Sequence, residues 1–207
     1  MNAHRIILAS TSRYRRELVE RLGLSVEAMA PDLDERAVEQ AMGSAPTEEI
    51  ARMLSLRKAR SLAGRFPDAL IVGADQIAEV GGERLHKPGN EENAREQLHK
   101  LAGRAHRLVT AVTVLRARDL HGESIVDVHT LTMRALSRAA IERYVARDKP
   151  LDCAGSYRIE ALGIALFERV EGLDFTAIVG LPLTALVTLL LRFGVDVLGV
   201  TPPSAGP

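Results

Sequence analysis

The sequence predicts a mixed α/β (α+β) fold, and three observations support this prediction. Short apolar runs typical of strands alternate with amphipathic helical segments along most of the chain. Hydrophobic residues make up 46% of the 207 residues and charged residues 26%, which is ordinary for a globular protein. A chain of this length buries roughly 70% of its unfolded surface on folding. Because aromatic residues are scarce, the core must consist mainly of Leu, Val, Ile and Ala.

The N-terminal half alternates between the two element types. The pattern predicts strands at 5–9, 25–30, 69–74 and 77–80, and helices at 13–22 and 47–63. Gly23 is a typical helix terminator, and Glu48–Glu49 suit the positive end of the second helix dipole. The apolar strand at 69–74 is expected to end at Asp75, and Gly81–Gly82 to form a hairpin turn.

The C-terminal half continues the alternation. Helices are expected at 90–101, 137–147 and 183–193, and strands at 106–116, 123–134 and 163–170. The two long strands should pair around Gly122, and Ser137 should cap its helix. The apolar run 177–191 falls short of the roughly 20 residues that span a bilayer. We therefore expect it to be a strand end, a turn at 180–182 and a buried helix.

Composition limits the class of protein. The 27 Lys and Arg balance the 27 Asp and Glu, which argues against generic binding to nucleic acid or a membrane surface. Cys153 is the single cysteine, so neither an internal disulfide nor a cysteine zinc site can form, and a reducing cytoplasm is the expected location. We expect one domain over residues 1–200 and a flexible tail, rich in Pro, Gly and Ser, over 201–207.

The first candidate site is the segment Ser10–Arg16, between the first strand and the first helix. Its hydroxyls and free backbone N–H groups at a helix N-terminus favour an anion, and Arg15 and Arg16 add donors suited to phosphate. The alternative is a serine cap followed by solvated arginines. Arginines in a first turn oppose the helix dipole, which favours an anionic ligand there.

Carboxylates form the second and third candidates. The segment 32–35 clusters acidic residues, which commonly hold Mg²⁺ or Mn²⁺ beside substrate phosphates; the alternative is a helix cap. Asp75 follows an apolar strand, where α/β folds place ligands and catalytic groups, and the alternative is an Asp in a turn.

The remaining candidates are cationic or glycine-rich. Lys87 and Lys58 are possible phosphate contacts that could equally be solvated surface. The segment 154–160, which ends at Glu160, could form a wall that recognises a base or could be a plain connection. The chain has no G-x-S-x-G, Walker A or G-x-G-x-x-G pattern, which removes three common enzyme signatures.

These motifs together resemble the Maf family of nucleoside triphosphate pyrophosphatases. The resemblance covers roughly residues 5–195, and its motifs are individually weak but specific in this order. They are Leu8–Ser12 with Arg15–Arg16, Ala30–Pro31 before Asp34–Glu35, Lys58–Ala59, Gly73–Asp75, Lys87–Pro88, Gly103 with His106, Ala154–Tyr157 and Val179–Pro182.

The resemblance implies an elongated, twisted sheet with a cleft between two lobes, as in inosine-triphosphate pyrophosphatases. It implies hydrolysis of a nucleoside triphosphate to the monophosphate and pyrophosphate, with Mg²⁺ or Mn²⁺, in a house-cleaning role and in a homodimer. Asp75 lands on the family's catalytic carboxylate and, with Glu35, on its metal position. The phosphate positions fall on Ser10, Ser12, Arg15, Lys58 and Lys87.

Three positions resemble the specificity determinants of the family, namely Tyr14, Gln76 and Glu160. They resemble the branch that acts on 7-methyl-GTP rather than the branch that acts on dTTP and UTP. Tyr14 replaces the Trp common in that branch, Arg13 replaces a usual Pro, and His86 stands where Gly is usual. Three alternatives stay open: a dTTP and UTP pyrophosphatase, a non-catalytic nucleotide-binding regulator of cell division, and a structural or interaction protein. The last would use the apolar helix at 183–193 at a dimer interface, which is compatible with an enzyme.

Overall fold

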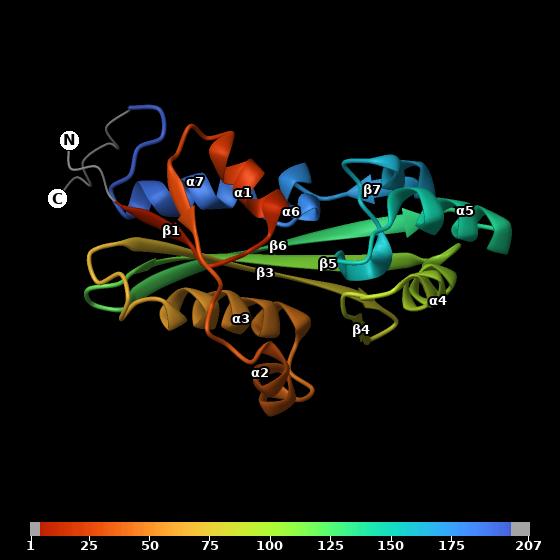
Figure 1. The fold of residues 1–207 in the computed structure, drawn as a ribbon, viewed down its shortest axis with the longest axis horizontal. Coiled ribbons are helices and arrows are strands. Elements are labelled where there is room, and N and C mark those ends of the chain that lie inside the picture. The colour runs from red at the N-terminus through yellow and green to blue at the C-terminus, as the bar shows by residue number, and fades with distance from the viewer. Residues whose placement is uncertain (1–4, 200–207) are drawn as a thin grey trace.

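The computed structural model describes residues 5–199, which form an elongated molecule built on one mixed sheet (Figure 1). The strands are β1 (Ile6–Leu8), β2 (Val26–Ala28), β3 (Leu70–Val80), β4 (Glu83–Leu85), β5 (Ala105–Arg116), β6 (His121–Met133) and β7 (Phe167–Glu171). The helices are α1 (Arg13–Glu20), α2 (Glu35–Met42), α3 (Thr47–Ser61), α4 (Glu91–Leu101), α5 (Arg138–Asp148), α6 (Phe175–Val179) and α7 (Leu183–Arg192), with short 3₁₀ turns η1 (Ala154–Ser156) and η2 (Leu162–Leu166).

The sheet confirms the predicted fold class. Its strand order is β2-β1-β3-β5-β6-β7, and β4 pairs with β3. β1 runs parallel to both β2 and β3, whereas β3, β5 and β6 form a long antiparallel centre. The predicted two-residue turn at Gly81–Gly82 joins β3 to β4, and both glycines have positive φ, as a tight hairpin requires.

Helices cover both faces of the sheet. In Figure 1, α2 and α3 lie on one face, α1, α6 and α7 lie on the other, and α4 and α5 lie at the far end with β7. Apolar side chains of α1 and α7 pack on β1, β3 and β5, and those of α3 pack on the opposite face of the same strands. A separate cluster joins α4, α5 and β7 to the far ends of β5 and β6. The core is therefore divided between a main body and an end lobe.

One glycine brings α3 unusually close to the sheet. A Cβ atom on Gly73 of β3 would lie 2.0 Å from the carbonyl oxygen of Ser55 and 3.0 Å from the backbone nitrogen of Ala59. Only glycine permits this approach. Lys58, between those two α3 residues, is consequently held against the next residues of β3.

Several predicted elements were wrong in detail. The strand that was expected to end at Asp75 continues to Val80, because β5 pairs with β3 along its whole length. Gly122 lies inside β6 opposite Leu115, and the turn is at 117–120. Residues 163–166 form a 3₁₀ turn before β7 begins.

Two helices were missing from the predicted order. The expected strand end at 177 is the helix α6, whose cap Asp174 accepts a hydrogen bond from the backbone N–H of Thr176. The acidic segment 32–35 leads into the helix α2, capped by Asp34, so the alternative interpretation of that segment is correct in part. Both helices are short, and short helices carry too few turns for a clear periodic signal.

The apolar helix α7 packs inside the chain. Its buried side chains belong to the main core, so they do not form an open interface, and the homodimer stays a prediction. Within residues 5–199, no helix is both long enough and apolar enough to cross a membrane. The predicted tail at 201–207 lies outside the described residues.

Candidate active site

The site lies where one edge of β3 is left without a strand. β1 pairs with β3 only as far as Leu8 opposite Val72, and β4 begins to pair at Ala78. Residues 73–77 of β3 therefore face an opening on that side. Asp75 thus lies just beyond the carboxyl end of its parallel neighbour β1, which is the position that binds ligands in open α/β sheets. The sequence predicted that Asp75 lies at the end of its own strand. The strand that ends there is instead its neighbour β1, while β3 continues to Val80.

A cleft of about 770 Å³ occupies this opening between the main body and the end lobe. It brings together residues from both ends of the chain. Its lining includes ten of the residues that the sequence singled out for the site: Ser10, Ser12, Tyr14, Arg15, Glu35, Lys58, Asp75, Gln76, Lys87 and Glu160.

The loop after β1 builds one wall of the cleft. Ser12 caps α1 by accepting a hydrogen bond from the backbone N–H of Arg15, and the Ser10 hydroxyl accepts one from the backbone N–H of Ser12 at 3.1 Å. The Arg15 guanidinium donates to Ser10 Oγ at 3.5 Å and to the carbonyl of Gly180 at 2.9 Å. Hydroxyls and a guanidinium therefore converge at the N-terminus of a helix, as an anion site requires.

The environment of Arg15 has opposing effects on its charge. Burial lowers the pKa of the Arg15 guanidinium below its ordinary value, whereas Asp75 and Glu35 raise it. An arginine remains protonated in such surroundings. Arg15 is therefore a fixed positive charge on the cleft wall. Arg16, which was grouped with it, turns outward to pair with Glu20 and does not line the cleft.

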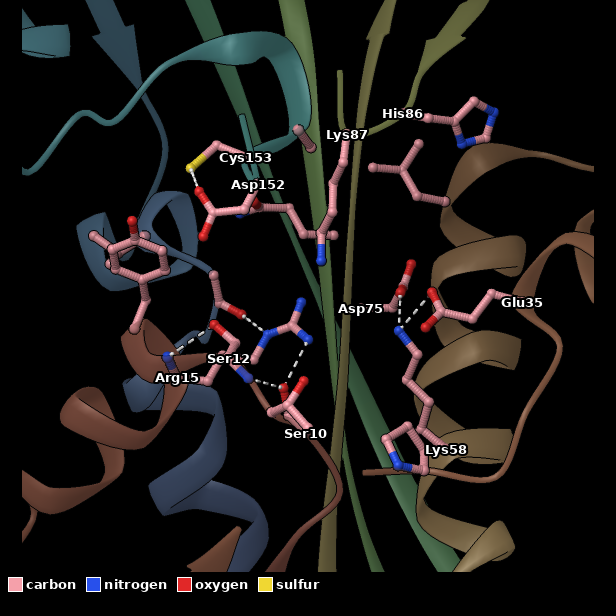
Figure 2. A pocket seen from close by; sticks show the side chains of 18 of the residues that line it. Ser10, Ser12, Arg15, Glu35, Lys58, Asp75, His86, Lys87, Asp152 and Cys153 are labelled. Atoms are coloured by element: carbon pink, nitrogen blue, oxygen red, sulfur yellow. Dashed lines mark hydrogen bonds and ion pairs between the residues drawn. The ribbon is translucent and has the colours of Figure 1, made fainter. Parts of the chain in front are cut away.

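The opposite wall carries a buried ion-pair cluster (Figure 2). Lys58 Nζ lies 2.6 Å from Asp75 Oδ1 and 2.9 Å from Glu35 Oε2. Lys58 and Asp75 are each 5% exposed, whereas the Glu35 side chain is half exposed at the start of α2. Three elements thus deliver one ammonium and two carboxylates to one point, although they lie far apart in the sequence.

The carboxylate pair fits a divalent metal that is shared with substrate. One oxygen of Asp75 and one of Glu35 converge on a single ammonium, so they reach a common point. Mg²⁺ typically takes one or two protein carboxylates and completes its shell with water and phosphate oxygens. Among residues 5–199, no group of three His, Cys, Asp or Glu side chains is arranged to hold a metal without such help.

Lys87 comes from the far side of the opening. It follows β4, and Figure 2 shows its side chain pointing down into the cleft, between the Arg15 side and the Asp75 side. The neighbouring His86 also lines the cleft, where its side chain is 64% exposed and lies 3.9 Å from Glu39. Lys87 therefore adds its positive charge to those of Arg15 and Lys58 in the cleft.

The end of the cleft nearest Tyr14 differs in character. Tyr14 lies under the guanidinium of Arg13, 4.7 Å from the ring centroid, and its hydroxyl accepts a hydrogen bond from Arg13 at 2.8 Å. Burial raises the pKa of Tyr14, and the bond from Arg13 opposes that effect. The Glu160 carboxylate lies 3.6 Å from the guanidinium of Arg158. An aromatic ring and a carboxylate thus border the same end of the cleft.

Gln76 lines the cleft and also connects two elements of its wall. Its side-chain nitrogen donates to the carbonyls of Ala177 at 2.7 Å and Ile178 at 3.0 Å, and to Thr110 Oγ1 at 3.1 Å. These bonds tie α6 to β3. Because Ile178 also lines the cleft, Gln76 fixes a wall of the site as well as facing it.

The sequence analysis missed several residues of the site. Arg36, Asp152 and Cys153 line the cleft, and Gly73 sets the approach of α3. A glycine inside an apolar strand is a usable signal of close packing. The others stand beside quoted motifs but carry no spacing pattern of their own.

The surroundings of His106 and Cys153 favour the uncharged form of each side chain. Burial lowers the pKa of His106 to about 4, and its Nε2 lies 3.0 Å from the Tyr157 hydroxyl. These surroundings fit a structural role for His106. Burial raises the pKa of the Cys153 thiol to about 12, which leaves it uncharged and unreactive.

Comparison with known proteins places the chain in a family. The Maf-like protein family matches residues 5–193, so the chain belongs to the Maf family. A Pseudomonas aeruginosa protein named 7-methyl-GTP pyrophosphatase is 43% identical over 194 residues, which cover 93% of this chain and 98% of that protein. A Thiobacillus denitrificans protein of the same name is 47% identical over 194 residues, which cover 93% of this chain and 94% of that protein.

A solved structure gives a weaker likeness. The Ham1 protein of Staphylococcus aureus aligns with 63% of this chain and 72% of its own, at 18% identity and a TM-score of 0.44.

Proposed function

We propose that this chain hydrolyses a nucleoside triphosphate to the monophosphate and pyrophosphate, and that 7-methyl-GTP is the preferred substrate. The observation that carries the proposal is the cleft itself, in which Arg15, Lys58 and Lys87 meet the Asp75 and Glu35 carboxylates, with an aromatic ring at one end. The names of relatives that are similar over nearly the whole chain support it.

The triphosphate would lie along the cationic part of the cleft. Arg15 and the hydroxyls of Ser10 and Ser12 offer donors at the N-terminus of α1, and Lys58 and Lys87 approach from the opposite walls. Donors that are fixed before substrate arrives lower the barrier by stabilising charge that develops in the transition state. Positioning and charge therefore supply most of the catalysis.

Asp75 would act on the attacking water. Its carboxylate accepts the proton as the water oxygen bonds to the α-phosphorus, and the bond from that phosphorus to the bridging oxygen breaks to release pyrophosphate. Lys58 holds the carboxylate in its orientation until substrate enters. Lys58 and its half-exposed partner Glu35 both line the cleft, so the same ammonium would then interact with the phosphates.

Glu35 and Asp75 would hold Mg²⁺ or Mn²⁺. Such an ion, when bound, neutralises phosphate charge and polarises the phosphoryl oxygens. The rest of the phosphate-binding charge comes from the side chains already described.

The base would lie at the end of the cleft that holds Tyr14. Methylation at N7 gives guanine a positive charge, and a cation over an aromatic face gains about 0.5–2 kcal/mol. The Glu160 carboxylate can accept hydrogen bonds from the N1–H and N2–H₂ groups of guanine, and it offsets the positive charge of the ring. Pyrimidines offer neither interaction, which favours 7-methyl-GTP over dTTP or UTP.

A substrate panel tests the proposal. Purified protein is incubated with Mg²⁺ or Mn²⁺ and 7-methyl-GTP, GTP, dTTP, UTP, CTP or ITP, and the products are separated chromatographically. Preferential conversion of 7-methyl-GTP to its monophosphate and pyrophosphate is the expected result, and a chelator should abolish it. Preference for dTTP or UTP would keep the reaction and contradict the specificity. Binding without turnover of any nucleotide would contradict the enzyme and favour a regulator.

A further inference from the structure

Arg158 lies behind the wall of the cleft rather than in it. It follows η1, and it is absent from the cleft lining although Tyr157 and Glu160 on either side of it are present. Its side chain is 25% exposed. Whatever Arg158 does for a bound nucleotide, it therefore does through its neighbours.

The backbone and side chain of Arg158 are anchored to α5. Its backbone N–H donates to the Tyr144 hydroxyl at 3.0 Å, and that hydroxyl donates to Asp148 Oδ2 at 2.8 Å. The Arg158 guanidinium lies 3.7 Å from Asp148 Oδ1, and the Asp148 side chain is only 8% exposed. This anchor sets the position of the guanidinium independently of the cleft.

From that anchor, the guanidinium reaches two groups that do line the cleft. It lies 3.6 Å from Glu160 Oε1 and 5.6 Å from the centroid of the Tyr14 ring. Arg158 Nε is buried without a hydrogen-bond partner among the described residues, so its contact with Glu160 is a charge interaction rather than a hydrogen bond. The Arg158 guanidinium thus interacts with both the carboxylate and the aromatic ring at the end of the cleft that would bind the base, hereafter the base end.

We propose that Arg158 is a positioning residue that sets the charge balance at the base end of the cleft, and so limits its preference for a cationic purine over a neutral one. This inference rests on the proposed function, because it concerns the base of that substrate. Arg158 already partly neutralises Glu160 and supplies a cation near Tyr14. A positively charged 7-methylguanine ring must share both groups with it, whereas neutral guanine meets no such repulsion.

The sign of the effect distinguishes this role from a merely structural one. Loss of the Arg158 charge should leave Glu160 free to pair with the base, so a cationic base should gain relative to a neutral base. A structural defect would instead lower turnover of both nucleotides together. The decisive quantity is the ratio of kcat/KM for 7-methyl-GTP to kcat/KM for GTP.

The experiment measures that ratio on the full chain by pyrophosphate release, with KM and kcat determined separately. Arg158→Gln should raise the ratio about two- to fivefold, the effect of one partly exposed ion pair. Arg158→Lys keeps the charge and should leave the ratio within the error of wild type. In a Glu160→Gln background, Arg158→Gln should change the ratio less, because the part of the effect that acts through Glu160 is gone and only the part near Tyr14 remains.

Controls separate the possible failures. Arg138→Gln removes an exposed arginine of α5 that pairs with Glu142, and it should match wild type in the ratio and in melting temperature. An unchanged or lowered ratio in Arg158→Gln, with wild type active on 7-methyl-GTP, would overturn the inference and leave the proposed function intact. If Arg158→Gln does not fold, a changed ratio in Arg158→Lys would overturn it equally. A wild-type protein that hydrolyses neither nucleotide would overturn the proposed function itself.

Discussion

Replacement of Asp75 by asparagine tests the centre of the site with a nearly isosteric change. The side chain keeps its shape and an oxygen that can accept a hydrogen bond from Lys58, but it loses its negative charge. The variant therefore removes the proposed proton acceptor and half of the carboxylate pair without opening a cavity. Effects on stability and on turnover can be measured separately.

The structure sets the expected size of the stability effect. Removal of one partner from a buried ion pair commonly costs about 3–5 kcal/mol, because the other charge is left unpaired. In Asp75→Asn, Lys58 still has Glu35 as a charged partner at 2.9 Å and an amide oxygen at position 75 as a neutral acceptor. The free energy of unfolding should therefore fall by an amount nearer to that of one hydrogen bond to a charged group. That loss is about 1.5–3 kcal/mol. For a chain of this size, it lowers the melting temperature by roughly 3–12 °C.

Turnover should fall much further than stability. A positioned general base contributes about 10²- to 10⁴-fold, and kcat for the preferred nucleotide should fall by that factor. The assay is steady-state pyrophosphate release at a temperature well below the melting transition of the variant. Asp119→Asn is the matched control, because Asp119 pairs with Arg116 in an exposed turn far along the chain from the site. Turnover of Asp75→Asn at the wild-type rate would refute the assignment of Asp75.

Three further predictions address the base, the packing of α3 and pH. Tyr14→Ala should reduce kcat/KM for 7-methyl-GTP more than for dTTP, by about two- to thirtyfold if the cation–π energy is lost, and an equal reduction on both nucleotides would contradict stacking. Gly73→Ala should destabilise the protein by about 1–3 kcal/mol and lower activity, because its Cβ would overlap the backbone of α3. Gly64→Ala, where a Cβ meets nothing within 4 Å, is its control in denaturant titrations. Burial lowers the pKa of His106 to about 4 in the folded state, so the unfolded chain binds this proton at a higher pH than the folded chain. The free energy of unfolding therefore keeps the full contribution of His106 above about pH 6.5 and loses it as the pH falls toward 4. His106→Gln should flatten the dependence of the free energy of unfolding on pH between about 4 and 6.5, whereas His99→Gln, at an exposed position, should not. Equal slopes in the wild type and both variants would contradict the assignment of this dependence to His106.

The local signals in the sequence predicted most of the secondary structure. The serine cap at 137, the paired glycines at 81–82 and the apolar helix beginning at Leu183 all lie where expected, because caps, tight turns and amphipathic periods act over a few residues. The same locality explains the errors. Strands were expected at 69–74 and 77–80, but nothing near Asp75 indicates that they join into the single strand β3, since long-range pairing with β5 sets that length.

The order of motifs along the chain was sufficient to predict the family, the fold class and ten of the residues that line the cleft. The sequence by itself therefore determined the chemical groups of the site, because residue types at ordered positions carry the chemistry. Only the tertiary structure decided how those groups meet. The gap between β1 and β4 opens the cleft, Gly73 lets α3 bring Lys58 against Asp75, and Arg158 approaches Tyr14 from the opposite end of the chain. Each of these contacts depends on packing between distant segments, which no local pattern encodes.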